Sequence, residues 1–150
     1  MGFRQVVLRV GLATAIVVGS GALTAMPASA ASDDTFWTWT GDGTDGCGYT
    51  AFIDYGEGAP GGGPNDDYIV IQDLCPDGHG VMGYAWLDGV YLGKKYNGIG
   101  WGYESVVWDP FPSGNVAAGQ FVGIKVCLVD GPDDPTPSYC ASVSHWSVDG

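Results

Sequence analysis

The sequence predicts a small all-β protein, an antiparallel β-sandwich with two disulfides that follows a cleaved signal peptide. Three observations lead to this fold class. Short runs rich in β-branched and aromatic residues alternate with turn residues along most of the chain. Glycine or proline interrupts nearly every window that is long enough for an amphipathic helix. Four cysteines follow an N-terminal segment that has the features of a secretory signal.

The first thirty residues have the three parts of a signal peptide. Arg4 and Arg9 form a positively charged region, an apolar run follows, and residues 28–30 form a small-residue cleavage site. The apolar run is rich in glycine, alanine and serine, and it is shorter than the roughly 20 apolar residues that span a bilayer. We therefore expect a secreted, extracellular protein that begins at Ala31 and does not associate with membranes.

Six segments of the mature chain are predicted strands: residues 49–55, 68–74, 81–87, 105–108, 120–129 and 139–148. In the fifth segment the apolar residues alternate from Val122 to Leu128, so these side chains should face the core while Lys125 points outward. Short strands separated by turns are typical of an immunoglobulin-like sandwich, which we assign to residues 48–150. Trp86 and Trp108 are expected in its core.

The connections support this assignment. Asp88-Gly89 lies between two apolar runs and predicts a type I′ hairpin turn. The Pro-Asp-Gly sequence at residues 76–78 predicts a second turn, and Gly119 a third. Residues 31–47 precede the sandwich and contain the sequence Phe-Trp-Thr-Trp. This segment is either a first strand or an N-terminal arm that adds to a partner.

The cysteines are Cys47, Cys75, Cys127 and Cys140. An even number of cysteines in an exported chain predicts two disulfides, because the extracellular environment is oxidising. Three pairings are possible. We favour Cys47–Cys75 and Cys127–Cys140, because each of these pairs joins neighbouring segments of a strand-rich chain.

The charge of the mature chain limits its partners. Three lysines oppose seventeen carboxylates, so the formal charge is −14 when the histidines are neutral. Such a field repels phosphate backbones and anionic lipid surfaces. Nucleic acid and membranes are therefore poor partners, and an extracellular protein, a glycan or a cation fits better.

Few residues suggest catalysis. His79 and His145 are far apart in the sequence, and they are interpreted as a loop histidine and a strand histidine. Glu57 and Glu104 are the only glutamates, but Glu57 lies in a glycine-rich loop that would fix a catalytic carboxylate poorly. No Gly-x-Ser-x-Gly motif and no phosphate-binding loop occurs. We therefore predict that the protein is not an enzyme and has no cofactor.

Three acidic turn clusters are candidate calcium ligands: residues 42–46, residues 65–67, and Asp130 with Asp133 and Asp134. Calcium takes about six to eight oxygen ligands, which loops of this kind can supply. None of the clusters has the EF-hand spacing, and aspartate is common in turns because its carboxylate accepts hydrogen bonds from nearby backbone N–H groups. We therefore assign no metal site.

The most unusual feature is the supply of aromatic side chains, with six tryptophans and eight tyrosines in the mature chain. Residues 91–103 place four aromatic residues and two lysines among glycines, and tyrosine and tryptophan dominate binding hot spots. This segment is either an interaction loop, spanning residues 93–103, or a set of rings that cover their own sheet. The candidate partner-binding residues are Phe36, Trp37, Trp39, Tyr91, Lys94, Lys95, Tyr96, Trp101 and Tyr103.

Three features together resemble a known group of proteins: the signal peptide, residues 115–131, and the closing strand that begins with Tyr139-Cys140. They are similar to the small secreted two-disulfide β-sandwich proteins of actinobacteria. One group of these is the small adaptor subunit of umbrella toxin particles. The resemblance implies a protein that links a lectin-bearing subunit to the repeat-built stalk of a large toxin chain.

These observations predict a non-catalytic secreted protein-binding module, and the resemblance implies that it is an adaptor subunit that links the components of an extracellular antibacterial toxin complex. Two alternatives remain open. A secreted protease or amylase inhibitor requires one protruding rigid loop, and a carbohydrate-binding module requires coplanar exposed aromatic rings. An adaptor, in contrast, requires two separate binding surfaces.

Overall fold

The computed structural model describes residues 34–54, 67–102, 104–111 and 115–148. These residues form eight β-strands: β1 (Phe36–Trp39), β2 (Gly48–Ile53), β3 (Tyr68–Asp73), β4 (Gly80–Leu87), β5 (Val90–Asn97), β6 (Val106–Trp108), β7 (Phe121–Val129) and β8 (Ser138–Trp146). Among the described residues no helix is long and apolar enough to cross a membrane. The predicted signal peptide, its cleavage site and Tyr103 lie outside the described residues.

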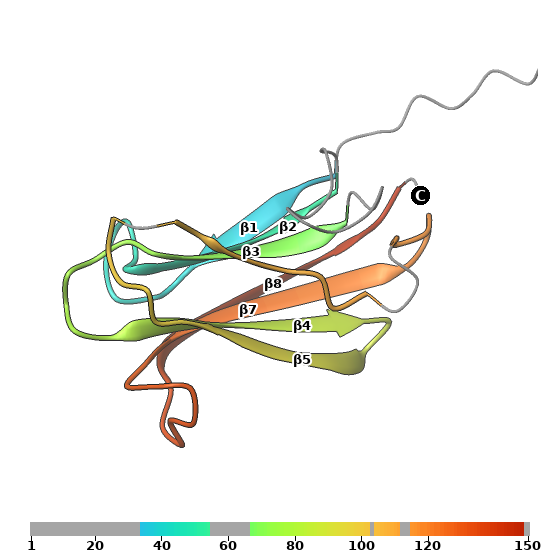
Figure 1. Ribbon diagram of the computed structural model, residues 1–150. Helices are drawn as coiled ribbons and strands as arrows, with labels where there is room; N and C mark the ends of the chain where they lie inside the picture. The colour runs from blue at the N-terminus through green and yellow to red at the C-terminus, as the bar shows by residue number, and fades with distance from the viewer. Residues whose placement is uncertain (1–33, 55–66, 103, 112–114, 149–150) are drawn as a thin grey trace, which may run out of the picture.

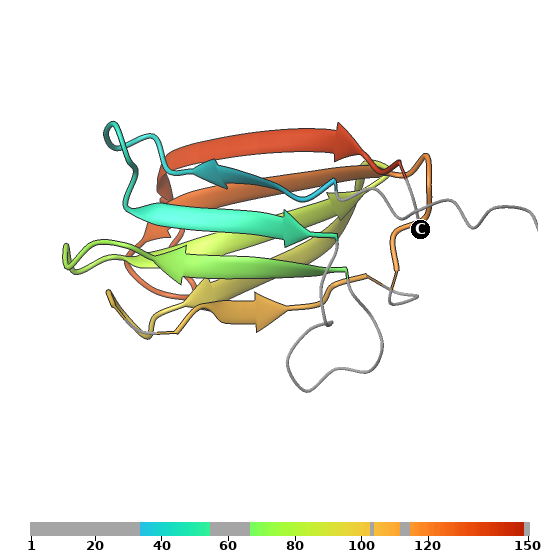
Figure 2. The same ribbon diagram turned by 90° about the horizontal axis from the view of Figure 1, so that it is seen from above.

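The strands form two antiparallel sheets that pack face to face (Figure 1). The first sheet has the order β1-β2-β3-β6, and the second has the order β5-β4-β7-β8. Figure 2 shows the first sheet lying over the second, with β1 next to β8 along one edge of the sandwich. The prediction of a small antiparallel β-sandwich is confirmed. The six predicted strands correspond to β2, β3, β4, β6, β7 and β8.

The core lies between the two sheets and is formed by every second residue of the strands. The alternate apolar residues of β7 from Val122 to Leu128 are buried and Lys125 points outward, as predicted. Each buried side chain of this size stabilises the fold by about 1.5–3 kcal/mol. Gly83 of β4 faces Ile71 of the first sheet, where an added Cβ would lie 2.6 Å from Ile71 Cγ1. A glycine here therefore allows the two sheets to approach closely.

The Asp88-Gly89 turn connects β4 to β5 and also fixes the start of β7. Both residues have positive φ angles, 51° and 79°, as a type I′ hairpin turn requires. The Asp88 carboxylate accepts hydrogen bonds from the Phe121 N–H at 2.8 Å and from Gln120 Nε2 at 2.9 Å. The predicted turns at Gly78 and Gly119 also have positive φ, at 86° and 83°.

The two disulfides are Cys47–Cys75 and Cys127–Cys140, which confirms the favoured pairing. The first joins the residue before β2 to the segment after β3, and the second joins neighbouring strands β7 and β8. Because β2 begins and β7 ends at the same end of the sandwich, both disulfides lie toward that end.

The ends of the described chain meet at the opposite end of the sandwich. The Val148 N–H donates a hydrogen bond to Asp34 Oδ2 at 2.7 Å. At the disulfide-bearing end, the Gly41 N–H donates to the Tyr139 carbonyl at 2.8 Å. These two contacts tie β1 to β8 across the open side of the sandwich, although the two strands belong to different sheets.

Two aromatic residues lie elsewhere than the sequence suggested. Phe36 was assigned to a partner contact, but it is only 7% exposed and its ring stacks on His145 at 4.6 Å, so it is part of the core. Trp86 was expected in the core, but it points outward from β4 because Ala85 takes the inward position. Trp108 packs against the core, as expected.

Candidate binding surfaces

An aromatic surface covers the outer side of the first sheet. We call it the Trp37 face and define it by Trp37, Trp39, Tyr49 and Gln72, which line a shallow groove of about 340 Å³. The alternation of side chains along β1 and β2 turns these residues away from the core. Trp37 and Trp39 are 54% and 43% exposed, and the ring centroids of Trp39 and Tyr49 are 4.7 Å apart.

The neighbouring outward positions extend the Trp37 face without adding charge. Val70 and Val107 are partly exposed and lie opposite each other on β3 and β6, and Ala51, which is fully covered, lies between Trp37 and Val70 in the register. None of the outward residues on β1, β2, β3 and β6 is charged. A contiguous uncharged surface on so acidic a chain is typical of an interaction site. Burial also raises the pKa of the Tyr49 hydroxyl above its ordinary value.

A second aromatic surface lies on the outer side of the second sheet, opposite the Trp37 face. We call it the Trp86 face and define it by Tyr84, Trp86, Tyr91, Phe121 and Trp146. The rings of Tyr84 and Trp86 are nearly parallel, at 21°, with centroids 6.3 Å apart, and Tyr91 continues the row at 5.3 Å from Trp86. A separate pair is formed by Phe121 and Trp146, whose centroids are 4.7 Å apart.

A third surface lies at the disulfide-bearing end of the sandwich. We call it the His79 hollow and define it by Asp73, His79, Tyr96, Trp101 and Asp130, which border a space of about 360 Å³. Trp101 is 56% exposed. Burial raises the pKa of Asp73, and the charge of nearby Asp77 acts in the same direction, although a hydrogen bond from the Cys75 N–H opposes both.

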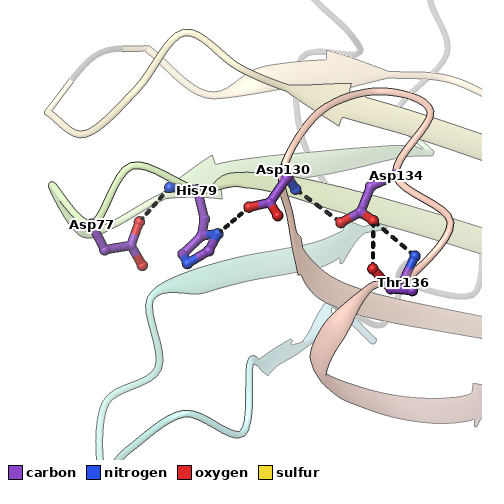
Figure 3. A network of polar contacts seen from close by, with 5 residues as sticks. All are labelled: Asp77, His79, Asp130, Asp134 and Thr136. Atoms are coloured by element: carbon purple, nitrogen blue, oxygen red, sulfur yellow. Dashed lines mark hydrogen bonds and ion pairs between the residues drawn. The ribbon is translucent and has the colours of Figure 1, made fainter.

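A chain of polar contacts runs from the His79 hollow into the loop between β7 and β8 (Figure 3). His79 Nδ1 lies 2.8 Å from Asp130 Oδ1, and the His79 backbone N–H donates to Asp77 Oδ1 at 2.9 Å. The Asp130 N–H donates to Asp134 Oδ2 at 2.9 Å, and the Thr136 N–H donates to Asp134 Oδ1 at 2.7 Å. These backbone hydrogen bonds hold the pKa of Asp134 below its ordinary value. The Asp134 carboxylate therefore helps to order this loop.

Among the described residues, the His79 hollow contains a histidine–carboxylate pair but no nucleophilic side chain beside it. Its lining has no serine or threonine, and Cys75 is bonded to Cys47. His145 lies near the opposite end of the sandwich, where it pairs with Val122. In the part of the chain that the structure describes, no three His, Cys, Asp or Glu side chains are placed to hold a metal ion. Glu57 lies outside the described residues, and Glu104 is exposed.

Apart from Phe36, which is in the core, and Tyr103, which lies outside the described residues, the aromatic residues singled out in the sequence fall on three separate surfaces. Trp37 and Trp39 lie on the Trp37 face. Tyr91 lies on the Trp86 face. Tyr96 and Trp101 border the His79 hollow. The structure therefore brings together the two tryptophans of β1, but it separates Tyr91 from Tyr96 and Trp101.

The two neighbouring lysines lie on β5 rather than in a loop. Lys94 Nζ donates a hydrogen bond to the Pro132 carbonyl at 3.0 Å, so it helps to hold the loop between β7 and β8. Lys95 is exposed on the same strand. Because β5 continues to Asn97, the segment interpreted as an interaction loop is a strand over its first half.

Sequence reasoning missed several surface residues of the two sheet faces. Tyr49, Phe121 and Trp146 were not singled out, and neither were Ser142 and Ser144, which lie beside Phe121 in a groove on the second sheet. The alternation of β7 and β8 was the available signal, because it places the odd positions of β7 and the even positions of β8 on the same outer side.

Replacement of Asp42 by asparagine is expected to reduce stability at neutral pH and less so in acid. Burial acts to raise the pKa of Asp42, but hydrogen bonds from Thr40 Oγ1 and the Cys47 N–H outweigh it, so this pKa lies below 3.8. A carboxylate with a lowered pKa stabilises the fold above about pH 3.8, and this contribution is lost as the pH falls through the folded-state pKa.

Urea denaturation of the wild type and of Asp42→Asn at about pH 7 and about pH 3 measures this effect. The difference in unfolding free energy should shrink at the lower pH. Asp45→Asn, at an exposed position of the same turn, is the matched control and should match the wild type at both values. An equal loss for Asp42→Asn at both pH values would contradict the assignment.

Comparison of the chain with protein-family models, with curated proteins and with solved structures gives no match. The comparisons therefore assign no family. The function has to be inferred from the two sheet faces and the His79 hollow.

Proposed function

We propose that the protein is a non-catalytic extracellular binding module of the adaptor type, which holds one protein partner at the Trp37 face and another at the His79 hollow. The observation that carries this proposal is the separation of two tryptophan-bearing surfaces on one sandwich. Trp37 and Trp39 project from the outer side of the first sheet, whereas Trp101 lies at the end of the molecule. Two partners can therefore bind without competing for the same residues.

The two surfaces suit partners of different character. The Trp37 face is uncharged and shallow, so it suits an apolar patch of a partner, against which the tryptophan rings would bury a large area at low entropic cost. The His79 hollow is bordered by the carboxylates of Asp73 and Asp130, and Asp77 accepts a hydrogen bond from the backbone N–H of His79. A partner that presents lysine or arginine complements this charge.

The two disulfides and the family resemblance support the same proposal. Two disulfides are typical of proteins that work in an oxidising extracellular environment. The resemblance to the adaptor subunit of umbrella toxin particles suggests the two partners, namely a lectin-bearing subunit and the repeat-built stalk of a large toxin chain. In that setting the module would connect the components of an antibacterial toxin complex.

Substitutions on the two surfaces should remove different partners. The tagged mature protein is purified from culture supernatant, and the captured proteins are identified by mass spectrometry. The variant Trp37→Ala/Trp39→Ala should lose one partner and Trp101→Ala the other, each substitution weakening capture by about 1–4 kcal/mol. Both variants should keep the melting temperature of the wild type within a few degrees, because these rings are exposed.

Val148→Ala is the matched control, since Val148 is 61% exposed but lies outside both surfaces. It should capture both partners at wild-type levels. Unchanged capture by both well-folded tryptophan variants would refute the adaptor proposal, and so would the loss of both partners from a single variant.

Inhibition of a secreted protease or amylase is a second candidate function, which one observation favours. The loop between β7 and β8 extends away from both sheets (Figure 1), the Cys127–Cys140 disulfide closes its base, and the Asp134 hydrogen bonds order it. A rigid protruding loop is what an enzyme's active-site cleft accepts. Titration of a protease and an amylase with the mature protein tests this function, because an inhibitor blocks activity at a one-to-one ratio.

A further inference from the structure

We propose that the outer side of the second sheet carries a binding site for a neutral saccharide, in addition to the protein contacts proposed above. The site is a groove of about 310 Å³ on the Trp86 face. We call it the Gly123 groove and define it by Trp86, Phe121, Gly123, Lys125, Ser142 and Ser144. It shares no residue with the Trp37 face or with the His79 hollow, so the saccharide site and the adaptor function can be tested independently.

A glycine in the middle of β7 forms the floor of the groove. Gly123 pairs with Trp86 on one side and with Ser144 on the other. Its φ is not positive, so the backbone conformation does not require glycine here. An added Cβ would lie 3.0 Å from Ser144 Oγ and 3.6 Å from Trp86 Cβ, and would therefore fill the notch between them. A glycine inside a strand weakens the strand and often marks the close approach of a ligand.

Aromatic rings form one side of the groove and continue beyond it. The nearly parallel rings of Trp86 and Tyr84, followed by Tyr91, provide a row of apolar surfaces along the second sheet. The C–H groups on the face of a pyranose ring pack against such surfaces, while its hydroxyl groups point sideways. Phe121 closes one end of the groove, and its ring is held in place by Trp146.

The opposite side of the groove supplies groups that bind hydroxyls. Ser142 and Ser144 contribute side-chain hydroxyls, which both donate and accept hydrogen bonds. Lys125 Nζ lies 5.0 Å from the centre of the Tyr84 ring, a cation–π contact that holds the ammonium group beside the groove. Of the described residues that line the groove, none carries a carboxylate. This combination of apolar walls with a few polar groups is typical of small-molecule sites, which measure about 300–1,000 Å³.

A saccharide fits this groove better than a peptide or an anion. The backbone groups of β7 are already paired with β4 and β8, so an extended peptide cannot add to this sheet as a further strand at the groove. A phosphate or an acidic sugar would meet a single ammonium group on a mature chain with a formal charge of −14. The remaining chemistry, ring faces opposite hydroxyl groups, matches a neutral polyhydroxylated ring.

Calorimetric titration of the mature protein with neutral hexasaccharides tests the proposal. The probes are cellohexaose, xylohexaose, mannohexaose, maltohexaose and chitohexaose. We expect at least one of them to bind and to change the tryptophan fluorescence. Trp86→Ala and Gly123→Val should each weaken that binding by about tenfold or more, the first by removing the ring and the second by filling the notch. Trp86→Phe should recover part of the affinity, because it keeps an aromatic face.

The matched control is Trp37→Ala, which removes an exposed tryptophan from the opposite side of the sandwich and should leave the affinity unchanged. Thermal melts establish that each variant is folded. Failure of all five probes to bind the wild type would overturn the proposal, as would full affinity in a folded Trp86→Ala variant. Neither result bears on the adaptor function, which is measured with Trp37 and Trp101 variants.

Discussion

Replacement of Phe52 by alanine is expected to lower the free energy of unfolding by about 3–5 kcal/mol. Phe52 has no exposed surface, and its ring lies 5.4 Å from that of Phe36 and 5.6 Å from that of Phe111, centroid to centroid. Removing it deletes a whole ring from the centre of the first sheet's inner side. β2, which carries Phe52, is hydrogen-bonded to β1 on one side and to β3 on the other. These strands cannot move far into the space left by the ring, so a cavity remains.

Urea denaturation of Phe52→Ala and of Phe52→Leu measures this effect. The leucine variant keeps most of the apolar volume and should lose less than half as much stability. Trp37→Ala is a nearby control, because Trp37 pairs with Ala51, the residue before Phe52, but its own ring lies on the outer side of the sheet. It should change the unfolding free energy by less than about 1 kcal/mol. A similarly small loss in Phe52→Ala would show that this ring is not central to the core.

Removal of either disulfide is expected to cost about 3 kcal/mol or slightly more. The Cys47–Cys75 disulfide closes a loop of 28 residues, whereas Cys127–Cys140 closes one of 13 residues. The chain-entropy model gives about 3.5 kcal/mol for the first loop and about 3 kcal/mol for the second. The cost arises mainly because the unfolded chain gains conformations when the covalent link is lost.

Two double variants, Cys47→Ala/Cys75→Ala and Cys127→Ala/Cys140→Ala, isolate the two contributions. Their unfolding free energies are compared with that of the wild type by urea denaturation without reductant. Reduced wild-type protein is the control and should lose about the sum of both values. If either double variant is as stable as the wild type, then the native fold rather than the covalent loop holds that end of the sandwich together.

The regular strands could be predicted from the sequence, because the alternation of apolar residues along them indicates a β-strand and no other structure. On β7 the apolar residues alternate without exception between Val122 and Leu128, and Cys127 is placed by its pairing with Cys140. The Asp88-Gly89 turn is equally local, since its two positive φ angles depend only on those two residues. Features that are settled within a few neighbouring residues were therefore predicted.

The surface around Tyr96 was harder to predict because its glycines have a tertiary role. Residues 93–103 were interpreted as a loop, because glycine recurs through this segment. In the structure the Tyr96 ring lies across Gly80 and Gly98, where any Cβ would collide with it. Gly80 begins another strand, so the need for glycine arises from a contact between β4 and β5 that no local pattern reveals.

Trp86 illustrates a second limit of the sequence. A large apolar residue within a strand is usually expected in the core, but β4 lies in the middle of the second sheet and has covered residues on both sides. Which side of such a strand faces the other sheet depends on the register with β7. The sequence alone does not determine that register, so the row of rings on the Trp86 face was not foreseen.

The hydrogen bond between Asp34 and Val148 has a mechanical consequence. Residues 34 and 148, the two ends of the described chain, lie at the same end of the sandwich, so a pulling force between them would peel β1 from β2 and β8 from β7, breaking hydrogen bonds one after another. Peeling of β8 reaches Cys140, and residues 48–74 and 128–139 lie inside covalent loops that tension cannot extend. β1 has four residues and β8 has nine, so β1 should be peeled off completely first. Because Trp37 and Trp39 lie on β1, tension across the chain would release the proposed partner of the Trp37 face before the remaining strands separate.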